Sequence, residues 1–441
     1  MTGLWAADDL GPDQCATVRT EHDVRGFVTR TCFKTGPPGR VGIESEWFVH
    51  DVADPAAPAD TAKPADQGRH VVGGERAEQS DRVSLDRLQQ LVEDASPLPG
   101  GSALTFEPGG QLELSTACGD NLPHARDLLD GDLHHLDKLL TDRGLLRVGV
   151  GLDPVRTPRR IYDSPRYAAM ESFFDLDGPA GRVMMASTAS VQVCLEAGTD
   201  AADVARRWAL TNALTPLLIA AFANSPLRLG LPTGFACSRQ DVWSHIDATR
   251  TSTPRGQDPA EAWARYALDA RVLLVRRDPE PWVAGPGMTL REWVSGDTPW
   301  GRPTFDDLAY HLSTLFPPVR PHGWLELRAI DALPDEQWPV AVAVATALVD
   351  DAGAADTARD AMSGLDGHHH RAARDALRDR DLRRAAERCF AAALAALPRL
   401  GADAALVAQV DDYADRYVST ARTPGDDLRD AWQRTTKEES A

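Results

Sequence analysis

Residues 40–49 read RVGIESEWFV, and this stretch places two acids in an otherwise apolar segment. Its β-branched and aromatic residues lie between a Gly/Pro cluster and a polar segment, which is typical of a β-strand. Because side chains alternate between the two faces of a strand, Glu44 and Glu46 leave the same face. Like charges repel there unless a cation lies between them, and paired carboxylates suit a hard ion such as Mg²⁺. A solvent-facing strand edge is the alternative interpretation of this stretch taken alone.

A second pair of acids flanks a predicted tight turn. In SALTFEPGGQLELST, residues 102–116, two short strands are expected on either side of the Pro-Gly-Gly turn at 108–110. A hairpin brings its flanks together, so Glu107 and Glu113 can converge on one site. The glycines leave room for a ligand near the backbone. A surface hairpin with solvated acids is the alternative.

Two later segments carry polar side chains among apolar neighbours. In GWLELRAID, residues 323–331, Glu326 and Arg328 share a predicted strand face. They form either a structural ion pair or a metal carboxylate beside a phosphate-binding guanidinium. In MMASTASVQVCLE, residues 184–196 and also a predicted strand, Gln192 stands between two valines. It is either a hydrogen-bonded core amide or a site residue.

Two further segments offer side chains that can bind an anion. One is CSRQDVWSHIDATRTSTPRG at 237–256, rich in Ser and Thr, and the other is SPRYAAM at 164–170. The alternatives are a solvated loop for the first and an exposed helix start for the second. The candidate residues are Arg239, Arg250, Arg166 and Tyr167. The three histidines at 368–370 are predicted to lie in a solvated loop.

The composition excludes several classes of protein. The 441 residues include 47 basic and 66 acidic ones, which gives a formal net charge of −19. So acidic a chain is unsuited to nucleic acid or to an anionic membrane surface. The start, MTGLWAADDL, lacks the basic and apolar regions of a signal peptide, so we do not expect it to be one. No apolar run has transmembrane length. The six cysteines form no C-x-x-C pair. We therefore expect a cytoplasmic protein. No P-loop or Rossmann glycine pattern is present.

The order of the predicted elements favours the α+β class. Strands with hairpin signals alternate with helices, which indicates an antiparallel or mixed sheet. We expect a catalytic domain at 1–335 that contains a mobile insertion at 52–82, rich in Ala, Pro, Asp and Gly. A helical C-terminal part is expected at 336–420, packed on that domain. A polar, frayed tail is expected at 421–441.

Eight stretches, taken in order, resemble the glutamate–cysteine ligases of the plant and proteobacterial type, a branch of the glutamine synthetase superfamily. The likeness is greatest to the actinobacterial enzymes of ergothioneine biosynthesis. The stretches lie between about residues 40 and 331, and beyond them the likeness is loose. They are GIESEWF, FEPGGQLELS, SPRYAAM, MMASTASVQV, FANSP, SRQDVW with DATRT, TLFPPVR and WLELRAID.

The resemblance implies a glutamine synthetase-like curved antiparallel sheet and an ATP-dependent ligase. ATP would phosphorylate the γ-carboxylate of L-glutamate, and the γ-glutamyl phosphate would react with the amine of L-cysteine to give γ-glutamylcysteine, ADP and phosphate. Two or three Mg²⁺ ions, or Mn²⁺, would bind at Glu44, Glu46, Glu107, Glu113, Glu326 and, less certainly, Gln192. Arg328 and Arg250 would hold phosphate, and Arg166, Tyr167 and Arg239 would bind the amino acids.

Other interpretations stay open at this point. A related ligase could use another amine acceptor, and a non-catalytic relative could bind metabolites without turnover. The five acids in place argue against the second alternative. The expected oligomeric state is a monomer or a homodimer.

Overall fold

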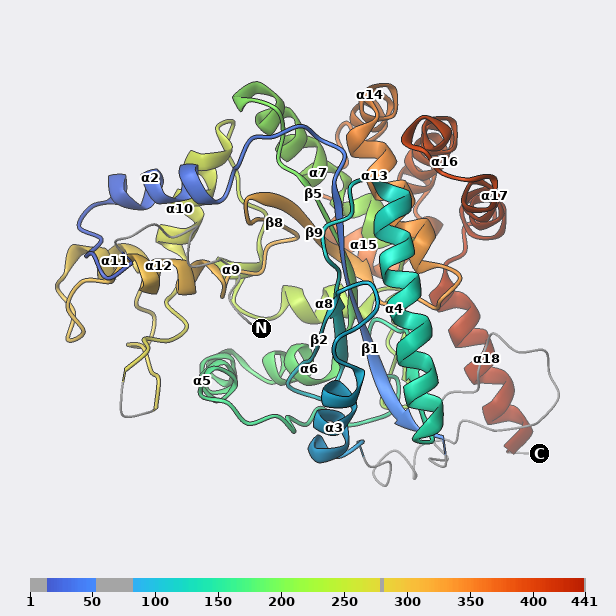
Figure 1. Cartoon of the computed structure of the whole chain (residues 1–441), viewed down its shortest axis with the longest axis horizontal. Coiled ribbons are helices and arrows are strands. Elements are labelled where there is room, and N and C mark those ends of the chain that lie inside the picture. The colour runs from blue at the N-terminus through green and yellow to red at the C-terminus, as the bar shows by residue number, and fades with distance from the viewer. Residues whose placement is uncertain (1–13, 53–81, 278–280, 440–441) are drawn as a thin grey trace.

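The computed structural model describes residues 14–52, 82–277 and 281–439 (Figure 1). Its centre is a seven-stranded sheet in the order β2-β3-β1-β5-β9-β8, and β4 pairs with the end of β1. Every pairing in the sheet is antiparallel, so the expected α+β class with an antiparallel sheet is confirmed. The strands are β1 (Val41–Asp51), β2 (Ala103–Phe106), β3 (Leu112–Ser115), β4 (Leu145–Val148), β5 (Ser190–Glu196), β8 (Val319–Pro321) and β9 (Trp324–Asp331). A separate ribbon pairs β6 (Leu227–Arg228) with β7 (Leu231–Pro232).

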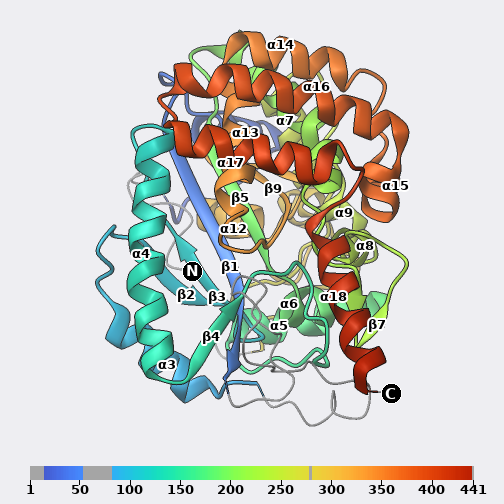
Figure 2. The ribbon, with the colours of Figure 1, turned by 90° about the vertical axis from the view of Figure 1, so that its right-hand side faces the viewer.

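The two faces of the sheet differ in what covers them. Along β1, Val41, Ile43 and Trp47 are buried, while Glu44 and Glu46 alternate with them and are less buried. Long helices contact strands on the apolar face, where they form a layer beside the sheet (Figures 1 and 2). These helices are α4 (Leu122–Asp142), α7 (Ala201–Ala221) and α13 (Trp338–Asp350). The opposite face, which carries Glu44 and Glu46, is therefore available for a functional site.

Shorter helices follow the strands and border the acidic face or its surroundings. Close to the sheet lie α3 (Leu85–Ala95), α5 (Pro165–Phe174), α6 (Ala180–Ser187) and α8 (Ser238–Ser244). The others are α2 (Glu21–Thr31), α9 (Ala248–Thr251), α10 (Pro259–Asp269), α11 (Leu290–Ser295) and α12 (Phe305–Leu312). Most of the segment expected as a strand at 184–196 is confirmed, but its first four residues end α6. Met and Ala there are good helix formers, and the backbone becomes extended only at Thr188.

The C-terminal part is helical and packs on the sheet layer. After α13 come α14 (Ala352–Ala361), α15 (His369–Asp375), α16 (Arg380–Ala396), α17 (Ala404–Tyr413) and α18 (Pro424–Glu439). Contacts join α13 to β5 and both α15 and α16 to α7. Within the described ranges no single helix is long and apolar enough to cross a membrane. Helices α13 and α14 reach that length and apolar character only when they are taken together, and the pair is bent by 97°. The insertion expected at 52–82 falls almost wholly on residues 53–81, outside the described residues.

The expectation of a frayed tail at 421–441 is wrong. Helix α18 occupies most of it, and Trp432 is only 7% exposed because it packs with Val155 and Leu227. The buried Asp426 accepts a hydrogen bond of 3.1 Å from Arg378. One aromatic anchor and this ion pair fix a segment whose overall polarity suggested fraying.

We therefore expect Trp432→Ala to lower the free energy of unfolding by about 3 kcal/mol, because truncating a buried aromatic side chain leaves a cavity. The matched control is Arg434→Ala on the same helix, at an exposed position, which should change the stability by less than about 0.5 kcal/mol. Chemical denaturation of both variants measures the difference. If both variants changed the free energy of unfolding by the same negligible amount, the tail would be frayed after all.

Candidate active site

Strand pairing gathers the acids on one face of the sheet. Glu46 lies directly opposite Glu113 of β3, and Glu44 lies opposite Gln192 of β5. Directly opposed residues of antiparallel strands project from the same face, so these side chains are neighbours. Glu107 enters from the β2–β3 turn, where its N–H donates to Gln111 and its carbonyl accepts from the N–H of Gly110, both at 2.8 Å.

A cavity of about 280 Å³ lies over this acidic face. Of the predicted site residues, only Glu326 and Arg250 do not line this cavity. The residues that line it come from segments far apart in the sequence. They are Glu44, Glu46, Glu107, Glu113, Gln192, Arg166, Tyr167, Arg239 and Arg328. We call this space the acid cavity.

Gln192 connects an acid to an arginine at the floor of the acid cavity. Its amide nitrogen donates to Glu46 at 3.2 Å, and its carbonyl oxygen accepts from Arg328. Glu46 accepts a second hydrogen bond of 2.9 Å from the backbone N–H of Ser190. Because the carbonyl oxygen of Gln192 is already engaged, its role as a metal ligand stays a prediction.

Burial and mutual repulsion favour the protonated form of three of the acids. Burial, followed by the charge of Glu113, raises the pKa of Glu46 to about 7. Burial first, then Glu326 and Glu113, raises the pKa of Glu44 well above its usual range. Burial with Glu113 and Glu46 does the same for the pKa of Glu107. A cation placed among these groups would remove the repulsion and restore their charge.

The acids do not yet form a closed ligand set. Over the part of the chain that the structure describes, no three His, Cys, Asp or Glu side chains are grouped closely enough to hold one metal ion. The donor set still fits a hard cation, since Mg²⁺ prefers a few carboxylates together with phosphate oxygens and water.

Glu326 lies beneath the cavity wall and is already paired. Its two oxygens accept from Arg320 at 2.6 and 3.0 Å, and one of them also accepts from Arg328 at 2.9 Å. Burial alone would raise the pKa of Glu326, but these two guanidinium groups lower it to about 2. A metal bound at Glu326 would have to share oxygens with arginines, so that role stays a prediction.

The sequence analysis missed Arg320. It is 5% exposed, lies opposite Glu326 in the β8–β9 hairpin and lines the acid cavity. The signal was present in VRPHGWLELR at 319–328, because a turn at Pro-His-Gly pairs the two flanks.

Arg250 does not line the acid cavity, and its role in holding phosphate stays a prediction. Its guanidinium is fully buried and donates to Asp247 at 3.0 Å, to the carbonyl of Thr314 at 2.8 Å and to the carbonyl of Arg271 at 2.7 Å. It also lies 4.7 Å from the ring centre of Phe173. Arg250 therefore braces the wall of the site instead of facing a ligand.

Arg166 and Tyr167 reach the acid cavity from the first turn of α5. The hydroxyl of Ser164 caps this helix by accepting from the N–H of Tyr167 at 3.2 Å. Arg166 donates twice to Ser313, at 3.2 Å each, and within the part of the chain that the structure describes its Nε has no hydrogen-bond partner. Burial, and then the charge of Glu107, raises the pKa of the Tyr167 hydroxyl, which therefore stays protonated.

Arg239 of α8 is 3% exposed and forms part of a second wall. It donates to the backbone carbonyl of Arg328 at 2.9 Å, and its other terminal nitrogen lies 3.9 Å from Asp331. That second nitrogen, Nη1, is buried and has no hydrogen-bond partner among the described residues, so the ion pair with Asp331 is its charged contact. A guanidinium so placed can bind a carboxylate or phosphate oxygen.

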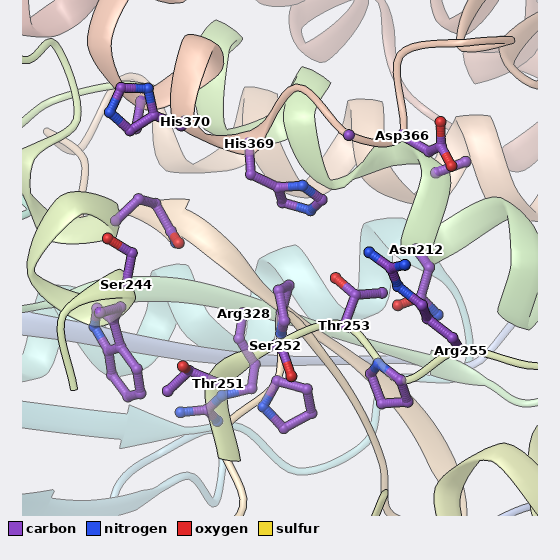
Figure 3. A pocket seen from close by; sticks show the side chains of 18 of the residues that line it. Asn212, Ser244, Thr251, Ser252, Thr253, Arg255, Arg328, Asp366, His369 and His370 are labelled. Carbon is purple, nitrogen blue, oxygen red and sulfur yellow. The ribbon is translucent and has the colours of Figure 1, made fainter. Parts of the chain in front are cut away.

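Beyond this wall lies a larger cavity of about 1270 Å³, which we call the outer chamber (Figure 3). Arg239, Trp243, Phe316 and Arg328 line both cavities, so the two spaces adjoin. His369 and His370 border the outer chamber, which corrects their assignment to a solvated loop. The three-histidine run alone gave no sign of this, because it depends on how α15 packs on α7.

The site combines carboxylates that can hold divalent cations with arginines that can hold anions. This combination suits phosphoryl transfer without a P-loop. Such a reaction needs positioning and charge neutralisation more than a protein nucleophile.

Comparisons with known proteins agree with this chemistry. The model of glutamate-cysteine ligase family 2 (GCS2) matches residues 40–441. The chain is 40% identical over 437 residues to the glutamate–cysteine ligase EgtA of Mycolicibacterium smegmatis, covering 97% of this chain and 95% of that one. It is 37% identical over 430 residues to EgtA of Mycobacterium tuberculosis, covering 93% and 94%. The chloroplastic glutamate–cysteine ligase of Arabidopsis thaliana is 31% identical over 340 residues, covering 73% and 62%.

A solved structure supports the fold. The crystal structure of a glutamate–cysteine ligase from Francisella tularensis in complex with AMP has a TM-score of 0.50 to this chain at 12% identity, covering 92% and 90% of the two chains. At that identity the likeness concerns the fold alone. The sequence match extends over the acid cavity and the helical C-terminal part alike, and the chain therefore belongs to glutamate-cysteine ligase family 2.

Proposed function

We propose that this protein is an ATP-dependent ligase that joins the γ-carboxyl of L-glutamate to the amine of L-cysteine. The observation that carries the proposal is an acid cavity faced by Arg239, Arg320 and Arg328, in a chain 40% identical to an EgtA glutamate–cysteine ligase. The product, γ-glutamylcysteine, would serve ergothioneine biosynthesis. The six cysteines are all free thiols, which fits a reducing cytoplasm.

The reaction proceeds in two steps, phosphoryl transfer and then attack by the amine. A γ-carboxylate oxygen of glutamate attacks the γ-phosphorus of ATP, and ADP leaves with the electrons of the broken bond. The amine nitrogen of cysteine then attacks the acyl carbon, phosphate leaves, and the nitrogen loses a proton. Charge must be neutralised on the transferring group in the first step and on the leaving phosphate in the second.

Metal binding is assigned to the unpaired carboxylates of the acid cavity. Two or three Mg²⁺ ions, or Mn²⁺, would be held chiefly by Glu44, Glu46, Glu107 and Glu113. Bound Mg²⁺ would screen the triphosphate and polarise the transferring phosphoryl group. The raised pKa values of three of these acids support the assignment, because burial and mutual repulsion there outweigh the charges of the nearby arginines.

The arginines act directly on the substrates. Arg328 lies at the boundary of both cavities and can contact two oxygens of the transferring phosphoryl group. Arg166 and Arg239 line the acid cavity, and their guanidinium groups can bind substrate carboxylates. Tyr167 stays protonated and can donate a hydrogen bond from the same wall.

A coupled ADP assay tests the proposal. ADP and phosphate should form only when Mg²⁺, L-glutamate and an amine acceptor are all present, and L-cysteine should be the best acceptor in a panel of amines. A stronger response to another amine would favour a related γ-glutamyl ligase. Binding of ATP without turnover would indicate a non-catalytic relative, and formation of AMP would exclude transfer of the γ-phosphoryl group.

We expect Glu46→Gln and Glu113→Gln each to lose most activity while staying folded. Removing one carboxylate relieves repulsion within the metal-free protein, so its melting temperature should hold or rise, while stabilisation by Mg²⁺ should fall. The control is Glu93→Gln on the exposed side of α3, which should change neither property. A variant that unfolds yet keeps its specific activity would show a structural role instead.

The Mg²⁺ effect should depend on pH. The folded-state pKa of Glu46, about 7, exceeds its ordinary value of 4.5, so its contribution to stability is present at low pH and is lost as the pH rises through 7. Bound Mg²⁺ removes that loss. The gain in melting temperature with Mg²⁺ should therefore be larger at pH 8 than at pH 6, and a thermal melt of Glu46→Gln should show a smaller difference.

Arg328→Lys should lower kcat by about 100-fold, as losing one preorganised charge-stabilising donor typically does. Lysine keeps the charge but makes only a point contact, so it should not replace the function of the arginine. The KM for ATP should change much less, because ground-state binding uses other contacts. If Arg328 only neutralised Glu326, Lys would keep kcat near that of the wild type while the melting temperature fell. Steady-state kinetics and a thermal melt separate these outcomes.

A further inference from the structure

Arg166 reaches the acid cavity without a carboxylate partner. Its two terminal nitrogens donate to the hydroxyl and to the carbonyl of Ser313, and within the described residues no acid lies at salt-bridge distance from its guanidinium. Arg328 on the same cavity differs, because it donates to Glu326 at 2.9 Å. The charge of Arg166 is therefore left for a ligand, and contacts other than ion pairs must hold its side chain.

The ring of Tyr310 holds this guanidinium from the last turn of α12. The central carbon of the Arg166 guanidinium lies over the ring, 5.1 Å from its centre. The negative face of an aromatic ring attracts a cation at such a distance. Ser313 follows directly after α12, and its hydroxyl donates to the carbonyl of Tyr310 at 2.7 Å. One end of α12 therefore presents a ring, a hydroxyl and a carbonyl to the same guanidinium.

Other contacts fix the ring of Tyr310 in this place. The guanidinium of Arg276 also lies over it, 4.3 Å from the ring centre, and donates to Asp306 one turn earlier on α12 at 2.7 Å. Trp282 meets the ring edge to face, with 6.2 Å between the ring centres. These contacts use the ring of Tyr310 and not its hydroxyl. The ring cannot turn away from Arg166 without losing them.

A fixed guanidinium binds a carboxylate more tightly than a mobile one. Arg166 is half-buried, and its long side chain would otherwise keep rotamer freedom that ligand binding must remove. Contacts that hold the side chain before the ligand arrives lower that cost of binding. The gain appears in the affinity for the ligand and not in the rate of the chemical step.

We propose that Tyr310 is a positioning residue whose ring orients Arg166 to bind a carboxylate of an amino-acid substrate. Tyr310 itself does not line the acid cavity, so it acts through Arg166 and not by contact with the substrate. This inference rests on the proposed function and adds a residue that tunes the affinity for an amino acid. The carboxylate belongs to L-glutamate or to L-cysteine, and the experiment distinguishes the two.

The experiment compares Tyr310→Leu and Tyr310→Phe with the wild type in the full-length protein. Tyr310→Leu should raise the KM for one amino acid about fivefold, the effect of a lost cation–π contact, and the KM that rises identifies the carboxylate. The kcat and the KM for ATP should stay within about twofold of the wild type. Tyr310→Phe keeps the ring and should match the wild type. A merely structural role would lower the melting temperature without this selective change in KM.

The control is Phe305→Leu, which removes another half-buried aromatic side chain from α12. The Phe305 ring packs on Phe27, with 5.8 Å between the ring centres, and should leave every KM unchanged. A double-mutant cycle shows whether Tyr310 acts through Arg166. Arg166→Gln alone should raise the same KM at least as much, and adding Tyr310→Leu should change it further by less than about twofold.

Three results would overturn the inference. They are unchanged amino-acid KM values in Tyr310→Leu, an equal loss in Tyr310→Phe, and the full effect of Tyr310→Leu persisting in the Arg166→Gln background. If Tyr310→Leu does not fold, Tyr310→Met, which fills the half-buried position with a flexible side chain, takes its place. A wild-type protein without ATP turnover would refute the proposed function alone. Calorimetric titration of glutamate and of cysteine into both proteins would then still measure the role of the ring.

Discussion

Carboxylates repel one another on one face of the central sheet, and packing on the opposite face must hold them there. Glu44, Glu46 and Glu113 come from neighbouring strands and share one wall of the acid cavity. Holding like charges together costs free energy, which the other face must offset. Ile43 and Trp47 alternate with the acids on β1 and are buried against the helix layer. Each fully buried apolar side chain contributes roughly 1.5–3 kcal/mol, so one strand both holds the charges and stabilises their position.

Arginines divide this face into two electrostatic regions. Burial opposes the ionisation of Glu326, but the charges of Arg320 and Arg328 lower its pKa to about 2. A few residues away, Glu46 has no arginine within hydrogen-bond distance in the described structure, and its pKa is about 7. The first region is already neutralised by the protein and gives a fixed frame for Arg328. In the second region the charges of Arg239 and Arg328 only partly offset burial and the repulsion by Glu113, and that difference determines where a cation can bind with the greatest gain.

Local patterns predicted the parts of the site that local rules control. Strand alternation placed Glu44 with Glu46, and the turn glycines placed Glu107 near Glu113, so the sheet and most of the acid cavity followed from the sequence. The burial of Arg250 outside the acid cavity could not be predicted, because two of its partners, the carbonyls of Thr314 and Arg271, are distant in sequence. The position of His369 beside the outer chamber and the packing of α18 were missed for the same reason. Both depend on helix packing, which neither hydrophobic periodicity nor composition reports.

A site built on strands binds polyphosphate differently from a helix N-terminus. A P-loop binds phosphate with backbone N–H groups, which carry only partial charges. Here fixed guanidinium groups, and cations held by carboxylates, would supply full charges from side chains on a rigid sheet. The cost is that the free site is destabilised by its own acids until cations arrive. Ligand binding therefore relieves an existing repulsion, so binding and folding stability are coupled through the same few carboxylates. An acidic chain with a formal charge of −19 can bind anionic substrates only by such a local reversal of charge.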